Sequence, residues 1–152
     1  MAQRTDLAAL PELHTVAAAR LRADAQRYTP NRRALVEVLE ATDQPLTIPD
    51  ILVRRHDLAQ SSAYRNLSVL EAAGVVHRIV TTDEFARYEL AEDLTGHHHH
   101  LICSACGAVT DFTVSSQVER TLSRALEQAA NDAGFRAEHH RLDLVGTCPT
   151  CT

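Results

Sequence analysis

The spacing of apolar residues predicts four helices in the first half of the chain. Apolar side chains recur every three or four positions over residues 6–27, 29–42, 46–56 and 59–73. Thr29 and Thr47 stand one or two residues before a proline and are the residue type that accepts hydrogen bonds from a first helical turn, so both are expected N-caps. Ser61 or Ser62 is expected to begin the fourth helix, and Gly74 to end it.

Strict alternation of apolar and polar residues predicts a hairpin directly after these helices. The stretches VVHRIV and FARYEL alternate with a period of two on either side of TTDE. Three short helices followed by a hairpin over residues 29–90 predict a winged helix-turn-helix. A generic small α+β domain is the alternative that this order of elements leaves open.

The second half of the chain carries a different pattern. HHHLIC, AVTDFTV and FRAEHHRLDLVGTC predict strands, and residues 115–134 predict an amphipathic helix with its apolar stripe on Val118, Leu122, Leu126 and Ala129. The polar stretch AEDLTG separates the halves. We therefore expect an α+β protein with three segments: a winged helix over residues 1–90, a hinge over residues 91–96, and a small α/β domain over residues 97–152. The resemblance described below implies that the first segment is the DNA-binding domain and the last the metal-binding dimerisation domain.

Composition narrows the classes of protein that fit this pattern. The chain has 152 residues, 45% of them hydrophobic, and a net charge of −5, which argues against wholesale coating of nucleic acid but allows a local basic face. No apolar run approaches the roughly 20 residues of a membrane span, and the first residues do not resemble a signal peptide. We expect a cytoplasmic protein with no membrane partner, in which cysteines serve as metal ligands or redox thiols rather than in disulfides.

Two Cys-x-x-Cys motifs lie 45 residues apart. Four thiolates complete the tetrahedral shell of a structural zinc ion, which leaves no open position for water. A pair of redox dithiols is the alternative, but neither motif follows the strand-to-helix pattern of a thioredoxin-like site. The sequence therefore predicts a four-cysteine zinc centre formed by Cys103, Cys106, Cys148 and Cys151.

Four consecutive histidines precede the first of these motifs. In an extended chain successive side chains point to opposite faces, so His97 and His99 are expected on one side, and His98 and His100 on the other. Two pairs placed back to back can serve two different metal ions. The alternative for any one of them is a solvated side chain.

These motifs together resemble the ferric uptake regulator family of metal-sensing repressors over about residues 15–151. SSAYRNLSVLEAAGVV is similar to that family's recognition helix and wing entry, HHHHLICSACG to its metal-binding core, and HHRLDLVGTCPTC to its closing strand. The histidine run brings the chain closest to the zinc uptake regulator branch. The resemblance implies a homodimer that binds double-stranded operator DNA when metal fixes the hinge.

The resemblance also implies three metal centres. The four cysteines match the structural zinc site. A site within the dimerisation domain matches His97, His99, Glu119 and His140, and the hinge sensory site matches His77, Glu89, His98, His100 and Asp111. Two departures affect the hinge. Pro45 stands where many relatives have a histidine, and the cysteine that zinc sensors supply before the histidine run is missing, which leaves Glu92 as a further alternative ligand.

Residues of the expected recognition helix and the segment before the second helix are the candidates for DNA contact. Tyr64 can press on thymine methyl groups, and Arg65 is expected to hold phosphate. The complete set of candidates is Arg27, Arg32, Ser61, Ser62, Tyr64, Arg65 and Asn66. A solvated helix face is the alternative for Arg32.

Other functions fit the sequence less well. No metalloprotease or deaminase motif is present, so we expect no enzyme and no small-molecule substrate. A zinc store or metallochaperone would explain the histidines but not the winged helix. We expect a repressor with structural zinc and two further divalent metal sites per subunit. Zinc is the expected sensed ion, and iron, manganese or peroxide sensing is the alternative.

Overall fold

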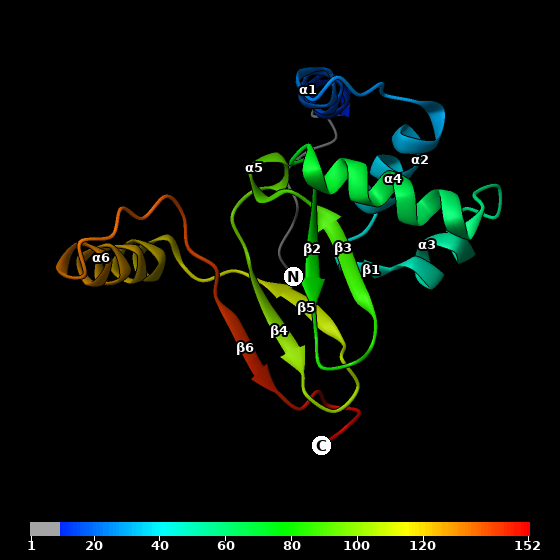
Figure 1. Ribbon diagram of the computed structural model, residues 1–152. Coiled ribbons are helices and arrows are strands. Elements are labelled where there is room, and N and C mark those ends of the chain that lie inside the picture. Colours follow the sequence, from blue (N-terminus) through cyan, green and yellow to red (C-terminus); the bar gives the residue numbers. More distant parts are fainter. Residues whose placement is uncertain (1–9) are drawn as a thin grey trace.

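The computed structural model describes residues 10–152, and Figure 1 shows their arrangement. The first part of the chain contains α1 Leu10–Ala23, α2 Pro30–Glu40, β1 Leu46–Thr47, α3 Ile48–Arg54, α4 Gln60–Ala72, β2 Val76–Val80 and β3 Ala86–Leu90. They are followed by α5 Glu92–Thr95, β4 His99–Cys103, β5 Val109–Phe112, α6 Ser116–Asp132 and β6 Asp143–Gly146. Residues 6–9 of the first expected helix lie outside the described part of the chain.

Side-chain caps begin the second and third helices as the sequence predicts. The Thr29 hydroxyl accepts from the backbone N–H of Arg32, and Pro30 occupies the first turn of α2. Thr47 and Asp50 form a capping box, in which each side chain accepts from the other residue's backbone N–H. The prediction that Ser61 or Ser62 begins α4 is wrong, because this helix begins at Gln60, after Ala59, and has no side-chain cap.

One apolar core joins α1 to α4 with the hairpin. Leu21 of α1, Leu35 of α2, and Leu67 and Leu70 of α4 are completely buried in it. Each buried leucine side chain contributes about 1.5–3 kcal/mol relative to an exposed one. The tightly packed helices therefore give the exposed face of α4 a rigid base.

The wing is a three-stranded antiparallel sheet in the order β1-β3-β2. The hairpin of β2 and β3 pairs Val76 with Leu90 and Val80 with Ala86, which places its turn at residues 81–85. The sequence did not predict β1, because two residues are too short to show a period and Thr47 already had a role as a cap. β1 pairs with the outer edge of β3 and so fixes the start of α3 against the wing.

A second three-stranded sheet has β4 in its centre, in the order β5-β4-β6. β5 pairs with β4 in antiparallel and β6 in parallel orientation. The last strand is much shorter than expected, because residues 135–142 form a connection from α6 to β6 rather than part of a strand. β4 therefore has neighbours on both edges that can bring ligands to its side chains.

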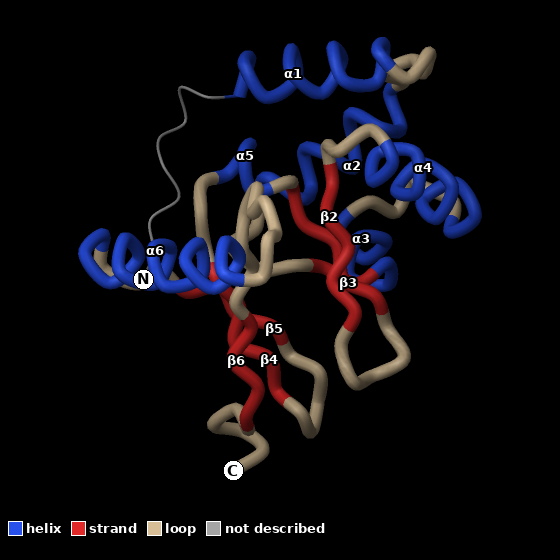
Figure 2. Tube along the Cα trace, turned by 60° about the vertical axis from the view of Figure 1, so that its left-hand side comes forward, coloured by secondary structure: helices blue, strands red, loops and turns tan. Residues whose placement is uncertain are grey.

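Helix α6 extends away from the second sheet (Figures 1 and 2), and none of its residues is buried. Val118 and Leu126 of the expected stripe are 51% and 40% exposed, and Leu144 and Val145 of β6 are also exposed. An apolar face of this kind usually marks an interaction surface. Within the described chain, the stripe on α6 has no core to pack against.

The expected hinge contains one helical turn, α5, which ends at Gly96 with φ of +98°. An ion pair between Arg20 and Asp93 ties this turn to α1. Beyond the turn, Ile79 of β2 packs against Ile102 and Val109 of the second sheet in a small buried cluster. The domain boundaries at residues 90 and 97 stay predictions. None of the helices described is long and apolar enough to cross a membrane.

We expect Thr47→Ala to lower the free energy of unfolding by about 0.5–2 kcal/mol, because it leaves the first turn of α3 without its acceptor. Urea denaturation measures the change. Thr47→Ser keeps the hydroxyl and serves as the control. A midpoint for the alanine variant equal to that of the wild type would show that the cap contributes nothing.

Candidate metal centres and nucleic-acid interface

The side chains of the histidine run point alternately to two sides, and each pair meets a different set of partners. Three groups of metal-ligating side chains have their ligand atoms within 4.8 Å of one another: Cys103, Cys106, Cys148 and Cys151; His97, His99, Glu119 and His140; and Glu89, His98, His100 and Asp111. The two pairs thus belong to separate groups, as an extended chain requires.

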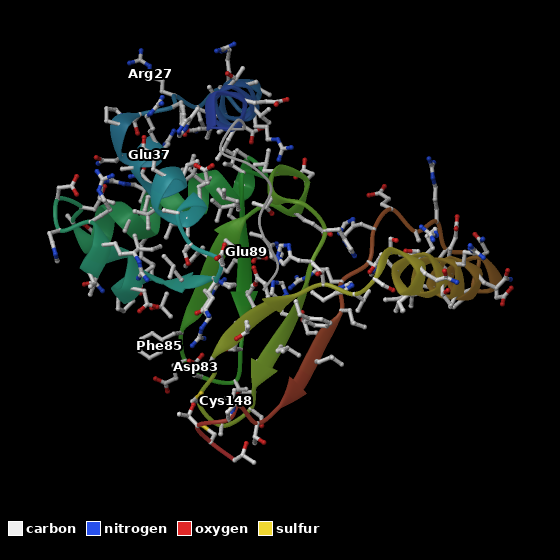
Figure 3. All side chains as sticks on the ribbon, turned by 180° about the vertical axis from the view of Figure 1, so that it is seen from behind. Arg27, Glu37, Asp83, Phe85, Glu89 and Cys148 are labelled. Atoms are coloured by element: carbon white, nitrogen blue, oxygen red, sulfur yellow. The ribbon has the colours of Figure 1, made fainter. Side chains whose placement is uncertain are left out.

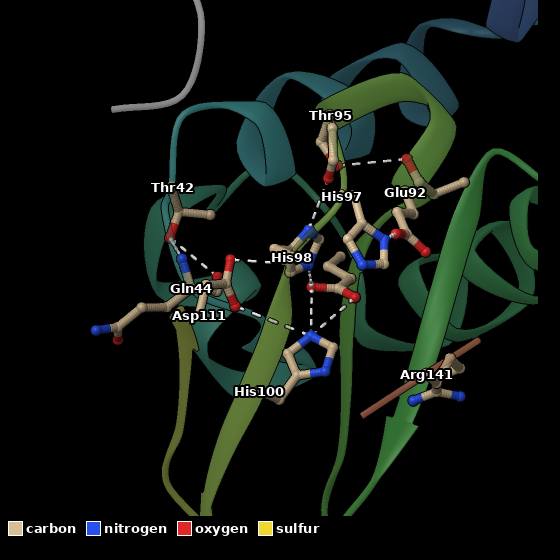
Figure 4. Close-up of polar contacts among 12 residues, drawn as sticks. Thr42, Gln44, Glu92, Thr95, His97, His98, His100, Asp111 and Arg141 are labelled. Atoms are coloured by element: carbon tan, nitrogen blue, oxygen red, sulfur yellow. Dashed lines mark hydrogen bonds and ion pairs between the residues drawn. The ribbon is translucent and has the colours of Figure 1, made fainter. Parts of the chain in front are cut away.

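The third group, here called the hinge group, takes Glu89 from β3 of the wing, His98 from the residue that directly precedes β4, and His100 and Asp111 from β4 and β5 of the second sheet. The Nε2 atoms of His98 and His100 each lie 3.2 Å from Glu89 Oε2. Both are also 3.9 Å from a carboxylate oxygen of Asp111. Figure 4 shows the imidazole rings of His98 and His100 beside the carboxylate of Asp111.

The opposite nitrogen of each of these rings is held by an oxygen atom. His98 Nδ1 lies 2.9 Å from the carbonyl oxygen of Gly96, and His100 Nδ1 lies 3.1 Å from Asp143 Oδ1. A proton on Nδ1 leaves Nε2 as the ligating nitrogen. This arrangement of partners around the ring is the one that metal-binding histidines use.

Glu89 and the two histidines of the hinge group shift one another's pKa values in opposite directions. Burial works to raise the pKa of Glu89, but hydrogen bonds with His100 and His98 outweigh it and hold this pKa at about 2. The same hydrogen bond to Glu89 raises the pKa of His98 to about 9, against the effect of burial. Burial lowers the pKa of His100, but contacts with Glu89 produce a net rise. Protonated histidines therefore balance the negative charge of the buried Glu89 carboxylate when no metal ion does so.

His77 lies beside the hinge group but outside the set of atoms that converge. It pairs with Glu89 across β2 and β3, and with the hinge histidines it lines a cavity of about 670 Å³. Its Nε2 atom is buried and has no hydrogen-bond partner among the described residues. Burial and the nearby Arg141 lower the pKa of His77, so its ring is neutral at pH 7. Glu92, the other alternative ligand, contacts His97 instead.

The second group lies wholly within the last 56 residues of the chain. Glu119 of α6 is its centre: His99 Nε2 lies 2.9 Å from one carboxylate oxygen, and His97 and His140 each lie 3.0 Å from the other. His99 is 1% exposed, and its Nδ1 atom has no hydrogen-bond partner in the described chain. The group ties α6 to β4 and to the connection that precedes β6.

The cysteine group joins the end of β4 to the last residues of the chain. The Sγ atoms of Cys106 and Cys148 lie 3.8 Å apart, and none of the four cysteines is in a disulfide. Backbone N–H groups, chiefly that of Cys106, lower the pKa of Cys103 to about 6. Cys148 and Cys106 raise the pKa of Cys151 to about 12 through hydrogen bonds with its thiol.

The donors of all three groups fit metal ions. Sulfur atoms on a tetrahedral zinc ion lie about 3.8 Å apart, which is the separation that Cys106 and Cys148 already have. In the two histidine groups, imidazole nitrogens and carboxylate oxygens point at one another in a way that suits a divalent cation. The hinge group would hold its ion between the two sheets, and the other two groups within the second sheet and its neighbours.

The expected DNA-contacting residues divide into exposed and engaged side chains. Tyr64, Arg65 and Ser61 on α4 and Arg27 before α2 are exposed, with Tyr64 52% exposed. Figure 3 shows Arg27 pointing away from the body of the protein. These four side chains are free to meet a ligand that lies against α4.

Arg32 is held within the protein instead of standing free. Its guanidinium group donates to Asn66 Oδ1 at 3.0 Å, to the Arg27 carbonyl oxygen at 2.6 Å and to Gln26 Oε1 at 3.1 Å. Asn66 in turn donates to Ser62. Arg32, Ser62 and Asn66, three of the candidates for DNA contact, therefore form a network that links α4 to α2 and to the segment carrying Arg27.

Sequence reasoning missed the residues that support the two sites. Asp143 orients His100, and Gln26 and Asn31 complete the network around Ser62 and Arg32. No motif marks such residues, because each acts through a contact between distant segments. The orientation of Asp143 toward β4 could have been anticipated only from the parallel pairing of β6.

Comparisons with known proteins give a consistent result. The model of the ferric uptake regulator family matches residues 24–145. The ferric uptake regulation protein of Bacillus subtilis is 31% identical over 138 residues, which cover 86% of this chain and 89% of that protein. The peroxide operon regulator of the same organism is 30% identical over 130 residues, which cover 83% of this chain and 84% of that protein.

Solved structures agree in fold. The ferric uptake regulator of Helicobacter pylori superposes with a TM-score of 0.74 at 21% identity, over 99% of this chain and 97% of that one. A zinc-bound manganese uptake regulator gives a TM-score of 0.61 at 27% identity, over 90% of this chain and 98% of that one. With a family model that spans most of its length, the chain belongs to the ferric uptake regulator family.

Proposed function

We propose that this protein is a cytoplasmic transcriptional repressor that binds operator DNA as a homodimer when a divalent cation occupies the hinge group. The observation that carries the proposal is the origin of the ligands: Glu89 comes from the wing, His100 and Asp111 come from the second sheet, and His98 directly precedes its central strand β4. A cation held there supplies bonds to both sheets at once.

The ligands of the hinge group would control how α4 is presented to DNA. Glu89 lies on β3, and the wing sheet shares one apolar core with α4. A change in the position of the wing therefore moves α4 with it. When Glu89 is tied to His98 and His100, the wing can no longer turn about residues 91–96. Two half-sites on DNA have a set spacing, so only dimers with correctly placed α4 helices can occupy both. The bound cation would thus select one existing arrangement.

We propose that the hinge senses iron(II) or manganese(II), the alternative to our first expectation of zinc. The hinge group brings two carboxylates and two imidazoles together and contains no thiolate. Oxygen-rich donor sets suit manganese and iron better than zinc. Relatives named as peroxide and ferric regulators support this assignment.

Zinc is the second candidate, and His77 favours it. A small turn of its ring would bring the unpartnered Nε2 atom toward the cavity that the hinge histidines line. A third imidazole would shift the donor set toward zinc. Titrations with Mn²⁺ and Zn²⁺ distinguish the candidates, since His77→Ala weakens only the binding of an ion that uses this ring.

We propose that α6 and β6 form the dimer interface. Their exposed apolar residues, Val118, Leu126, Leu144 and Val145, have no partner within the described chain. The His97, His99, Glu119 and His140 group would hold α6 at the angle that the interface requires. The four-cysteine centre is proposed to hold structural zinc and to anchor the end of the chain next to β6.

We expect His98→Ala and His100→Ala to abolish the gain in operator affinity on adding Mn²⁺, which we expect to be about tenfold or more in the wild type. Each substitution removes a ligand that spans the two sheets. Fluorescence anisotropy with DNA selected by the metal-loaded protein measures the gain. His56→Ala, which changes an exposed histidine outside the three groups and outside the cavity beside the hinge, is the control. An unchanged gain in both ligand variants would refute the proposed function.

We expect Arg65→Ala to weaken DNA binding and to reduce the salt slope by about one, as loss of one phosphate contact does. The urea midpoint of the Arg65→Ala variant should equal that of the wild type, because the Arg65 side chain is exposed. Arg32→Ala should lower both DNA affinity and the urea midpoint, since it breaks the network to Asn66. Equal midpoints for the two variants would show that Arg32 has no structural role.

We expect the metal affinity of the hinge to rise with pH between about 6.5 and 9, by up to about tenfold per unit for each proton displaced. The pKa of His98 is raised to about 9 by Glu89, so the metal-free ring keeps a proton that the cation must displace. Calorimetric titrations in buffers of different ionisation enthalpy count the protons released. Binding with no release at pH 7 would contradict this picture of the hinge.

A further inference from the structure

The tip of the wing lies on the turn that carries two of the zinc-centre cysteines. The Thr82 hydroxyl donates to the carbonyl oxygen of Ser104 at 3.4 Å. The carboxyl group of Asp83 approaches Gly107 so closely that a Cβ atom there would lie 2.9 Å from Oδ1 and nearer still to Cγ and Oδ2. Figure 3 shows Asp83 at the end of the wing that faces Cys148. The two sheets therefore meet at a second place, away from the hinge.

Asp83 cannot swing away from this contact freely. Arg87 holds its carboxylate with two hydrogen bonds of 2.8 Å, one to each oxygen, and the Thr81 hydroxyl contacts it as well. The Asp83 side chain is 24% exposed and that of Arg87 is 11% exposed. A two-pronged arginine–carboxylate pair is among the most rigid ion pairs in proteins.

The turn on the other side is fixed by the cysteine centre. Gly107 has φ of +71°, and its N–H donates to the carbonyl oxygen of Cys103 at 2.9 Å. Cys106 precedes it directly, so the position of Gly107 depends on the two cysteines that the centre draws together. Between this contact and the hinge, Ile79, Ile102 and Val109 close the joint with a buried apolar cluster.

We propose that the wing tip and this turn form an intramolecular latch, by which the loaded four-cysteine centre positions the wing and strengthens the hinge site. The inference rests on the proposed function of the hinge. Asp83 and Glu89 belong to one hairpin, and Glu89 lies 3.2 Å from His98 and His100 while the latch is closed. Latch and hinge cation favour the same arrangement, so opening one weakens the other by the same factor.

Two glycines provide a matched test. Gly107 and Gly134 have φ of +71° and +68°, but a Cβ atom at Gly134 would meet nothing within 4 Å. Both alanine variants therefore carry the same backbone strain, and only Gly107→Ala collides with Asp83. We expect Gly107→Ala to accelerate hydrogen exchange at residues 81–85 by at least about fivefold, and to weaken Mn²⁺ binding at the hinge by a similar factor. Gly134→Ala should do neither.

Asp83→Ala separates an opened latch from general misfolding. Asp83→Ala removes the three atoms that lie nearest to a Cβ atom at Gly107, so the double variant should exchange no faster than Asp83→Ala alone. In wild-type protein, removal of zinc from the four-cysteine centre should accelerate exchange at residues 81–85 and leave the amides of α4 unchanged.

The hydrogen-exchange measurements use the whole chain without DNA and without metal at the hinge. They therefore test the latch even if the hinge senses no cation. Equal exchange in Gly107→Ala and Gly134→Ala, additive effects in the double variant, or a wing tip indifferent to zinc removal would each overturn the latch. A freed wing tip with unchanged Mn²⁺ affinity would overturn its coupling to the hinge. If the wild-type protein does not bind Mn²⁺ at the hinge, the proposed function is contradicted and the latch is not.

Discussion

The pleat of β4 is the constraint on which the metal chemistry of this protein depends. Together with the two residues that precede β4, it sends four adjacent histidines to two sides, and the central position of β4 lets other elements supply partners on each side. One pair meets Glu119 of α6 within the second sheet and its neighbours. The other meets Glu89 of the wing, so two neighbouring side chains on one strand belong to sites with different mechanical consequences. A shift of one residue in the register of β4 would exchange the two sites.

The hinge is closed by charge even without a cation. Glu89 is almost completely buried, and hydrogen bonds with His100 and His98 stabilise its charged form there and hold its pKa at about 2. On the proposed function, a metal ion would replace protons in an arrangement that already exists. To move the competent fraction from 1% to 99%, the cation must prefer that arrangement by about 10⁴-fold, or about 5.5 kcal/mol. Every other contact across the joint, including that of Arg20 with Asp93, changes how much of this preference the metal itself must provide.

The sequence predicts those parts of the structure that follow from local rules. The caps at Thr29 and Thr47 and the alternation of the histidines depend only on residues next to each other. The clustering of the cysteines follows from zinc chemistry and the family resemblance. The contact of Asp83 with Gly107 depends on where one sheet lies on another, which no periodicity records. The engagement of Arg32 and the exposure of the apolar stripe on α6 are long-range properties of the same kind.

The length of the histidine run is a poor guide to the sensed metal. The run resembles the zinc branch of the family, but only His98 and His100 reach the hinge, and the ligands they meet there are carboxylates. The other two histidines serve a site that does not span the sheets. On the proposed function, selectivity at the hinge would depend on Glu89, Asp111 and the orientation of His77, three residues that lie outside the run. The length of a histidine run would then say less about the sensed metal than the carboxylates that meet it.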